Sequence, residues 1–336
     1  MPGDALDVMA VGHAVVDVIA SATDEEIDFH GLVKGSMILV DAGQIETTYA
    51  AMGPAVESSG GSAANTVAGV ASFGGAAAFI GKVRDDQLGR VFTHDIRSIG
   101  VEFATAPATD GEATALCLVM VTPDAQRTMT TYLGAARALS ADDIDRDTIA
   151  RSQITYLEGY LWDPPDAISA LRQAMAWAHE DGRKVAFSLS DPFCVDRHRD
   201  EFLDLLSDGA VDVLFANEAE ALSLFEVSSL DEAMGAVQGT CEIAAFTRGP
   251  AGSLVVSGGE VVETPAEPVD QVLDTTGAGD LYAAGFLFGL THAADLTACA
   301  RLGSVAAAEV ISHVGARPQT SLAALAVPVF REKPNL

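Results

Sequence analysis

Short apolar runs of strand length alternate with helical patterns through most of this 336-residue chain. The runs are typical of buried parallel strands, and they cover residues 7–12, 77–82, 154–159, 185–190, 211–217 and 243–249. Between two of them, Leu88, Phe92, Ile96 and Ile99 recur at helical spacing, and Gly100 follows as a helix-ending glycine. This alternation predicts an α/β fold, in which helices cover both faces of a mainly parallel sheet.

Residues 14–40 and 101–133 depart from the alternation, because they resemble strands and turns without helices. The second stretch predicts a hairpin, 113–121 and 127–133, across the turn Thr122, Pro123 and Asp124. We expect these stretches to form a small β lid domain over the carboxyl ends of the main strands, where ligands of open α/β sheets bind. Residues 1–13, 41–100 and 134–336 would then form the large domain.

Composition and charge restrict the possible partners. No uncharged apolar run reaches the length of about eighteen residues that a membrane span needs, and no basic segment precedes the first apolar run, so we expect a cytoplasmic protein. The formal net charge of −29 argues against nucleic acid and anionic membranes, which attract basic surfaces. The four cysteines lie far apart without metal-ligand spacing, and we interpret them as buried thiols.

The heptapeptide DTTGAGD, residues 274–280, lies between an apolar-rich run and a helical stretch. The first amides of a helix that follows such a glycine-rich turn are unpaired and attract anions. Asp280, beside this turn, could take a proton from an attacking hydroxyl while the amides stabilise the transferred group. The alternative is a strand-to-helix turn with an acid favoured by the helix dipole alone.

Two segments in the first half of the chain suit a hydroxylated ligand. In SSGGSAAN, the pair Gly60 and Gly61 permits close approach, and Asn65 offers both a donor and an acceptor for a sugar diol. A tight helix-entry loop packed for steric reasons is the alternative. Asp17, among β-branched residues, could equally be an exposed acid on a strand edge.

Two further segments follow predicted strands at their carboxyl ends. In NEAE, Asn217 and Glu220 would share one helix face, suited to ordering metal-bound water, or would form a capping box. In TRGPAG, Thr247, Gly249 and Gly252 could cradle a nucleotide or simply turn the chain into a hairpin. The chain lacks GxxxxGK[ST], and GHAVVD replaces GxGxxG after the first strand, which argues against P-loop enzymes and dinucleotide-dependent oxidoreductases.

Taken in this order, GGSAAN, NEAE, TRGPAG and DTTGAGD resemble the ribokinase-like (PfkB-type) kinase family. The similarity extends from residue 7 to HVGARP at 313–318, and KGSMILVD, LSDPF and RTMTTYLGA are similar to segments of its adenosine kinases. The resemblance implies a ribokinase-like fold, with a central mainly parallel sheet and a small β-sheet lid. It also implies phosphoryl transfer from ATP to the ribose 5'-hydroxyl of adenosine, with Mg²⁺ as cofactor and a monovalent cation as a further candidate cofactor.

The resemblance assigns roles to particular residues. Asp280 would be the catalytic base, the amides of Gly277, Ala278 and Gly279 the anion hole, and Arg127 a lid arginine that closes on the phosphates. The substrate-binding set would be His13, Asp17, Met37, Gly60, Gly61, Ser62, Asn65, Met129, Leu133 and Phe193. The ATP site would comprise Asn217, Thr247, Gly249, Gly252, Thr275 and His313, and Asn217 with Glu220 would order Mg²⁺.

Departures from the family pattern affect the nucleoside contacts. His13 stands where adenosine kinases often have Asn, and Met37 where some have Gln. The apolar side chains that could sandwich a base are equally suited to core packing: Leu39, Met129, Leu133, Leu161 and Phe193. The alternatives are a ribokinase, fructokinase or inosine-guanosine kinase, or a non-catalytic nucleoside sensor. We expect small-molecule partners alone, and a monomer or a homodimer.

Overall fold

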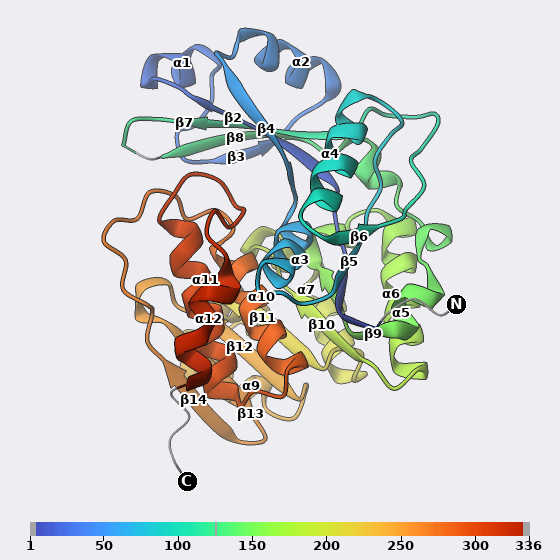
Figure 1. Ribbon diagram of the computed structural model, residues 1–336, viewed down its shortest axis with the longest axis vertical. Coiled ribbons are helices and arrows are strands. Elements are labelled where there is room, and N and C mark those ends of the chain that lie inside the picture. Colours follow the sequence, from blue (N-terminus) through green and yellow to red (C-terminus); the bar gives the residue numbers. More distant parts are fainter. Residues whose placement is uncertain (1–4, 125, 332–336) are drawn as a thin grey trace.

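The computed structural model describes residues 5–124 and 126–331 of the chain. Within these residues, a sheet of nine strands has the order β14-β13-β12-β11-β10-β9-β1-β5-β6 (Figure 1). Neighbouring strands are parallel from β12 to β6, whereas β13 and β14 are antiparallel. The strands are β1 Leu6–Val11, β5 Ala77–Ile80, β6 Val101–Phe103, β9 Ser152–Glu158, β10 Lys184–Ser188, β11 Val213–Asn217, β12 Ile243–Thr247, β13 Ser253–Ser257 and β14 Glu260–Thr264.

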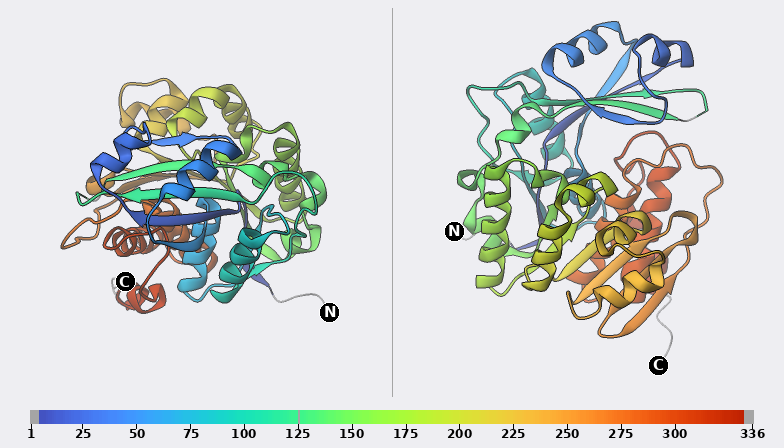
Figure 2. Two further views of the ribbon diagram at one scale, coloured as in Figure 1. Left: turned by 90° about the horizontal axis from the view of Figure 1, so that it is seen from above. Right: turned by 180° about the vertical axis from the view of Figure 1, so that it is seen from behind.

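Helices cover both faces of this large sheet, as the views from the front and from behind show (Figures 1 and 2). Successive side chains of β1 point to opposite faces, so Val8 and Ala10 pack in one core cluster and Met9 and Val11 in the other. The first cluster includes α3, α10 and α11, and the second includes α6 and α7. The predicted α/β class is therefore confirmed.

The helices differ widely in length. They are α1 Asp24–Phe29, α2 Ala42–Ala51, α3 Ser62–Ser72, α4 Gln87–Ser98, α5 Arg146–Arg151, α6 Pro165–Glu180, α7 Pro192–Ser207, α8 Glu218–Phe225, α9 Leu230–Val237, α10 Ala278–Thr291, α11 Leu296–Ile311 and α12 Leu322–Arg331. Short 3-10 turns cover Gly134–Ala138, Ala141–Asp143, Gly159–Trp162 and Gly249–Ala251. No helix of the described residues is both long and apolar enough to cross a membrane.

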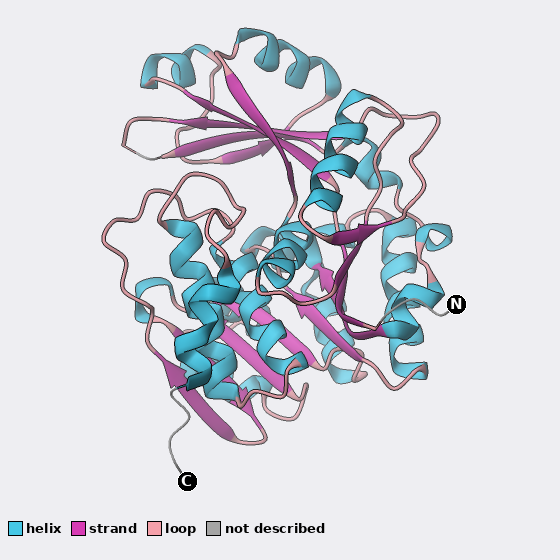
Figure 3. Cartoon of the chain, in the orientation of Figure 1, coloured by secondary structure: helices cyan, strands magenta, loops and turns pink. Residues whose placement is uncertain are grey.

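A smaller sheet stands at one end of the large one (Figure 3). Its order is β3-β8-β7-β2-β4, with β2 Val15–Ser21, β3 Met37–Leu39, β4 Ala55–Gly60, β7 Ala115–Val121 and β8 Arg127–Tyr132. The strands β7 and β8 form the expected hairpin, with Val121 opposite Arg127. Only residues 12–14 separate β1 from β2, so the chain passes directly from one sheet into the other.

Two strands lie in a different sheet from the one expected. β4, within the 41–100 segment assigned to the large domain, pairs with β2 in the small sheet. β6, within the 101–133 segment assigned to the lid, extends the large sheet as a parallel neighbour of β5. We keep the division into a large domain and a lid as a proposal, with β4 moved to the lid and β6 to the large domain.

Candidate active site

Asp280 lies in the first turn of α10, directly after a glycine-rich turn in which one residue has a left-handed backbone conformation. Gly277 precedes the helix with φ at +74°, and a Cβ there would approach Ala316 Cβ to 2.8 Å. No side chain caps this helix end. The amide of Ala278 makes a long hydrogen bond of 3.3 Å to the Thr275 carbonyl, and Gly279 is exposed. The turn therefore has the uncovered amides and small residues that an anion cradle requires.

Two side chains of α3 hold the Asp280 carboxylate. Ser62 Oγ donates to Oδ1 at 2.6 Å, and Asn65 Nδ2 donates to Oδ2 at 2.9 Å. The two helices pack closely, because a Cβ on Gly69 would lie 2.5 Å from Ala284 Cβ. Burial raises the pKa of Asp280 to about 6, although the bonds from Ser62 and Asn65 lower it. This places a weakly basic carboxylate at the edge of the turn.

The glycine pair brings Asp17 to the same place. A Cβ on Gly60 would lie 2.2 Å from Asp17 Oδ2, and one on Gly61 would lie 2.1 Å from the His13 carbonyl. Gly61 also has φ at +100°, which a side chain resists. The pKa of Asp17 is raised to about 7, mainly by burial; the charge of nearby Arg317 opposes this rise and the charge of Asp280 contributes to it. The predicted residues Asp17, Gly60 and Gly61 therefore lie together near Asp280.

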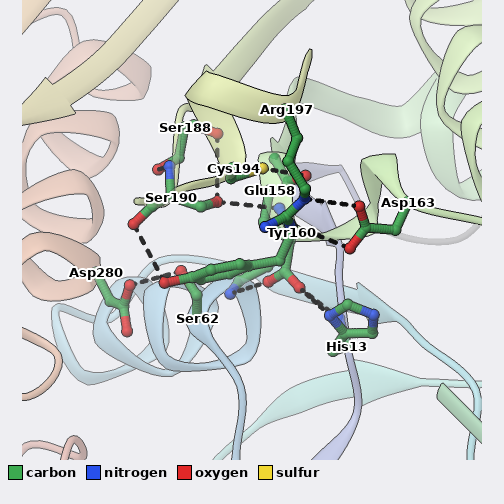
Figure 4. A network of polar contacts seen from close by, with 12 residues as sticks. His13, Ser62, Glu158, Tyr160, Asp163, Ser188, Ser190, Cys194, Arg197 and Asp280 are labelled. Atoms are coloured by element: carbon green, nitrogen blue, oxygen red, sulfur yellow. Dashed lines mark hydrogen bonds and ion pairs between the residues drawn. The ribbon is translucent and has the colours of Figure 1, made fainter. Parts of the chain in front are cut away.

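Glu158, at the end of β9, is a buried acid that the sequence analysis did not single out. Its carboxylate accepts bonds from the His13 and Ala63 amides, both at 2.8 Å, and contacts the His13 ring at 3.1 Å (Figure 4). It thereby joins the end of β1 to the start of α3. The sequence signal that could have identified Glu158 is the position of an acid at the carboxyl end of the apolar run ITYLEG. Tyr160, two residues later, contacts the Ser190 carbonyl at 3.3 Å.

Arg317 is the second residue that the sequence analysis missed, although HVGARP contains it. Its guanidinium donates to the Ser59 carbonyl at 3.0 Å, to Ser59 Oγ at 3.0 Å and to the Ala64 carbonyl at 2.6 Å. These bonds fix the chain on both sides of the glycine pair. Burial lowers the pKa of Arg317 to about 10, and the charges of Asp95, Asp17 and Asp280 oppose this shift. Its positive charge therefore faces both site carboxylates.

Three polar atoms of the predicted site are buried without a hydrogen-bond partner among the described residues. They are His13 Nε2, Asn65 Oδ1 and Arg127 Nε. Buried polar groups are normally paired, so each unpaired group calls for a partner such as a ligand. A molecule with several hydroxyl groups would supply donors and acceptors for all three.

Arg127 connects the small sheet to the glycine-rich turn. Its Nη1 lies 2.6 Å from Asp274 Oδ1, the first residue of the heptapeptide. Asp274 also accepts the amides of Thr276 at 2.7 Å and Gly315 at 2.8 Å. Burial lowers the pKa of Arg127, while the charge of Asp274 raises it. In this arrangement the guanidinium is next to the turn and paired with a carboxylate of the turn itself.

Asn217 and Thr247 are side by side, because they are register partners at the carboxyl ends of β11 and β12. Asn217 and Glu220 form the capping box of α8, in which Glu220 Oε2 accepts the Asn217 amide at 2.8 Å. Burial raises the pKa of Glu220 to about 7, and the charges of Asp191 and Asp280 add to this rise. The capping-box alternative for NEAE is therefore confirmed, and the cap fixes a buried carboxylate on which the charge of Asp280 acts, while its part in ordering a metal stays a prediction.

The other residues predicted for the ATP site lie on turns. Gly249 has φ at +55°, and a Cβ added there would have no neighbour within 4 Å. A Cβ on Gly252 would lie 2.1 Å from the Thr264 carbonyl. Thr275 is exposed. His313 Nε2 lies 3.2 Å from Glu309 Oε2, and Glu309 Oε1 accepts the amides of Gln319 at 2.9 Å and Thr320 at 2.7 Å. Glu309 thus fixes the loop that carries Arg317.

The apolar candidates for base binding fall into two groups. Met37 and Met129 are register partners in the small sheet, Leu133 is half-buried, and Leu39 and Phe193 are exposed. Leu161 is fully buried in the core among α6 and α7 residues, so it cannot contact a ligand and the core-packing alternative is correct for it. The structure therefore removes Leu161 from the candidates for base binding, and the role of the other side chains stays a prediction.

Among the described residues, no group of three or more His, Cys, Asp or Glu side chains is placed to hold a metal ion. The cysteines Cys117, Cys194 and Cys299 are buried free thiols, as expected, and Cys241 is half-buried.

Comparisons with known proteins identify the family. Residues 7–322 match the pfkB family of carbohydrate kinases. The solved structure of adenosine kinase from Sinorhizobium meliloti is 51% identical, with a TM-score of 0.91 over 96% of this chain and 99% of that one. A probable sugar kinase from Rhizobium etli is 46% identical, with a TM-score of 0.92 over 98% and 99% of the two chains.

Adenosine kinase from Saccharomyces cerevisiae is 28% identical over 330 residues, which are 91% of this chain and 95% of that protein. The ribokinase-like fold class is confirmed by the two solved structures, both above 45% identity. Phosphoryl transfer to an alcohol group is the chemistry of this enzyme. The chain belongs to the PfkB family of carbohydrate kinases.

Proposed function

We propose that this kinase phosphorylates adenosine, transferring the γ-phosphoryl group of ATP to the ribose 5'-hydroxyl to give AMP and ADP. The support is the 51% identity to the Sinorhizobium meliloti adenosine kinase along nearly the whole of both chains. The Rhizobium etli relative, called a probable sugar kinase, favours a free sugar as the second candidate substrate.

The geometry at Asp280 carries the proposed mechanism. Its carboxylate is held by Ser62 and Asn65 at the start of α10, where the uncovered turn can receive a phosphate. The remaining lone pairs of the two oxygens can accept the proton of an attacking hydroxyl. The amides of Gly277, Ala278 and Gly279 would stabilise the charge that develops on the transferred group.

The ribose would bind between the glycine pair and the small sheet. Asp17 would accept bonds from the sugar diol, and Gly60 and Gly61 would let the sugar lie against the backbone. The unpaired atoms His13 Nε2 and Asn65 Oδ1 would then gain partners. We propose that Met37, Met129, Leu133 and Phe193 contact the base once the small sheet closes.

ATP would lie along the carboxyl ends of β11 and β12, against Asn217, Thr247, Gly249 and Gly252. Thr275 and His313 would border this site, and Arg127 would exchange Asp274 for the phosphates. Mg²⁺ keeps several waters and uses one or two carboxylates besides the nucleotide, and the buried, oriented Glu220 fits that requirement. Bound Mg²⁺ would neutralise phosphate charge, while Asn217 and Glu220 position its waters.

A competition assay tests the substrate. We expect purified protein with Mg-ATP to phosphorylate adenosine with a higher kcat/KM than ribose, fructose, inosine or guanosine. A higher kcat/KM for a free sugar would replace adenosine by that sugar and would leave the fold and the family unchanged.

Replacement of the proposed base tests the mechanism. In Asp280→Asn we expect kcat to fall by roughly 10²- to 10⁴-fold, because the amide cannot accept the proton. Adenosine binding, measured by calorimetry, should persist, since Asn can still contact Ser62 and Asn65. Turnover of the variant at the wild-type rate would refute the assignment. The control Asp110→Asn, at an exposed loop residue, should keep full activity.

A further inference from the structure

A cavity lies outside the candidate active site. It has a volume of about 630 Å³ and is formed by α4 and by the segments before α4 and after β6. Its polar lining comes chiefly from Arg84, Arg90, Thr93, His94, Arg97 and Thr105. Figure 1 shows α4 beside the small sheet, at a distance along the molecule from the ATP-side strands β11 and β12. A cavity of this size is typical of sites for small molecules.

Three basic residues of this cavity share one side of a helix. Arg90, His94 and Arg97 are spaced by four and three residues along α4, so their side chains project from the same face. Arg84 approaches them from the segment before the helix. The whole chain has 48 acidic residues and 19 Lys and Arg residues, so three arginines around one cavity are a marked local reversal of charge.

Carboxylates neutralise only part of this charge. In the described ranges, neither Arg84 nor Arg97 has an ion pair within 4.0 Å, and Arg90 pairs through Nη1 with Asp85 at 3.0 Å. Asp85 also lines the cavity and is the one acid among its described lining residues. Nearby Asp86 accepts the Gly89 amide at 2.8 Å and the Thr114 amide at 2.9 Å, and the charge of Arg84 helps to lower its pKa, so Asp86 offsets part of the Arg84 charge.

Two of the guanidinium groups are already fixed in position. Arg84 Nη1 donates to the Gly111 carbonyl, and Arg97 Nε donates to the Phe103 carbonyl at 2.9 Å. These bonds use only part of the donors of each group and leave its charge intact. Because the side chains are held before any ligand arrives, binding would cost less conformational entropy than it would for free surface arginines.

Thr105 supplies an independent sign of a missing partner. Thr105 lines the cavity, and its hydroxyl is buried without a hydrogen-bond partner among the described residues. A buried hydroxyl without a partner is unfavourable, and an acceptor oxygen in the cavity would satisfy it. An anion with several oxygens could bond to Thr105 and to the guanidinium groups at once.

We propose that this cavity is a binding site for a phosphate group, either as inorganic phosphate or as the monoester of a small metabolite. Planar guanidinium groups match the oxygens of a phosphate, and their bonds to it are charge-assisted. The site is separate from the proposed catalytic site, and the proposal is independent of which alcohol the enzyme phosphorylates.

Calorimetry on the full chain tests the site. The probes are ribose 5-phosphate, inorganic phosphate and, as the neutral control, ribose. The variant Arg84→Gln/Arg90→Gln removes two charges, and Arg146→Gln on α5, which pairs with Glu180 on the surface, is the matched control. Thermal unfolding of each protein establishes that it is folded.

We expect at least one of the two phosphate probes to bind the wild type and the Arg146→Gln control, and to bind the double variant at least about tenfold more weakly. Tighter binding of ribose 5-phosphate than of phosphate would identify a monoester as the ligand, and equal binding would identify the free anion. Unchanged affinity in the folded double variant, or no binding of either phosphate probe to the wild type at about 10 mM, would overturn the proposal. Equal loss of ribose binding would also overturn it, because the charge would then not be what the site recognises.

Discussion

Burial raises the pKa of three carboxylates around the candidate active site. The pKa of Asp280 is raised to about 6 and those of Asp17 and Glu220 to about 7, in each case mainly through loss of solvation. Asp280 contributes like charge to both of the others. Such values near neutrality are typical of groups that exchange protons during a reaction.

Activity should therefore fall on the acidic side. A protonated Asp280 cannot accept the hydroxyl proton, so we expect kcat/KM to decrease as the pH falls through about 6. The measurement is kcat/KM between about pH 5 and pH 8.5, with circular dichroism to verify that the protein stays folded. A flat profile down to pH 5 would contradict the proposed base.

The Ser62 hydroxyl offers a way to assign that profile. Its bond to Asp280 lowers the pKa of the carboxyl, so removal of the donor in Ser62→Ala should raise this pKa and move the acidic limb to higher pH. Ser169→Ala, which removes an exposed hydroxyl of α6, should leave the profile in place. An unshifted limb in Ser62→Ala would mean that another group governs it.

The ionised Asp17 carboxylate should lower the free energy of unfolding, although it contributes to binding of the sugar. Its pKa is raised from 3.8 to about 7 in the folded protein, so stability decreases as the pH rises between these values and the full cost is present above pH 7. We expect Asp17→Asn to increase the free energy of unfolding by about 2 to 4 kcal/mol at pH 8, with little difference near pH 4. Urea unfolding at both pH values measures this difference.

The same variant should lose nucleoside affinity, because the amide no longer offers two acceptor oxygens to a sugar diol. Asp110→Asn, in an exposed loop, should show neither effect. Equal free energies of unfolding for Asp17→Asn and the wild type at pH 8 would show that burial of this charged carboxylate does not destabilise the protein.

At the scale of elements, the junction of β4 and α3 is the most demanding segment. Gly61 combines a positive φ of +100° with a backbone neighbour 2.1 Å from any added Cβ. We expect Gly61→Ala to displace the start of α3, and with it Ser62, by enough to lower kcat/KM about 10²-fold. Steady-state kinetics measures the loss.

Gly182 provides the matched control for that substitution. It also has a positive φ, at +65°, but nothing lies within 4 Å of an added Cβ. Gly182→Ala should therefore cost about 1 kcal/mol of stability through backbone strain alone and should keep its activity. Similar kinetics for the two variants would show that the clash at Gly61 is relieved without moving the site.

Elements were predictable where the signal is local. The apolar runs that became β1, β9 and β11 are bounded by turns and are long enough to recognise. β6 has only three residues, and its place beside β5 depends on sheet pairing rather than on its own pattern. The sequence pattern does not reveal that β4 belongs to the small sheet, because its partner β2 precedes it by more than thirty residues.

The site residues likewise differ in whether a local sequence pattern predicts them. Asp280, Gly61 and Asn65 belong to short motifs whose spacing is visible in the chain. Glu158 and Arg317 act across 145 and 258 residues of sequence, on the His13 amide and the Ser59 carbonyl respectively. No local pattern encodes such contacts, so only the folded arrangement reveals them. Leu161 shows the reverse case, since an apolar side chain near the site can be entirely core.

At the scale of the whole molecule, the net charge of −29 must affect stability. Like charges on a compact surface repel, and added salt screens them. We expect Tm to rise by several degrees between about 0.05 and 1 M NaCl, measured by differential scanning calorimetry. KCl should act equally, because screening does not depend on the cation.

A rise in KCl alone would instead indicate a specific cation site, and a Tm that falls with salt would contradict the screening argument. The proposed phosphate-binding cavity around α4 should respond to salt independently of Tm. Its attraction for anions weakens as the ionic strength increases.

The loop held by Glu309 has a further consequence. It sets Ala316 against Gly277 and Arg317 against Ser59 and Ala64, so residues 316–320 complete a site whose other parts begin at residue 13. During translation, a ribosome-bound nascent chain that ends before residue 320 lacks these contacts. We therefore expect products that terminate before residue 320 to be inactive even if most of the large sheet has formed.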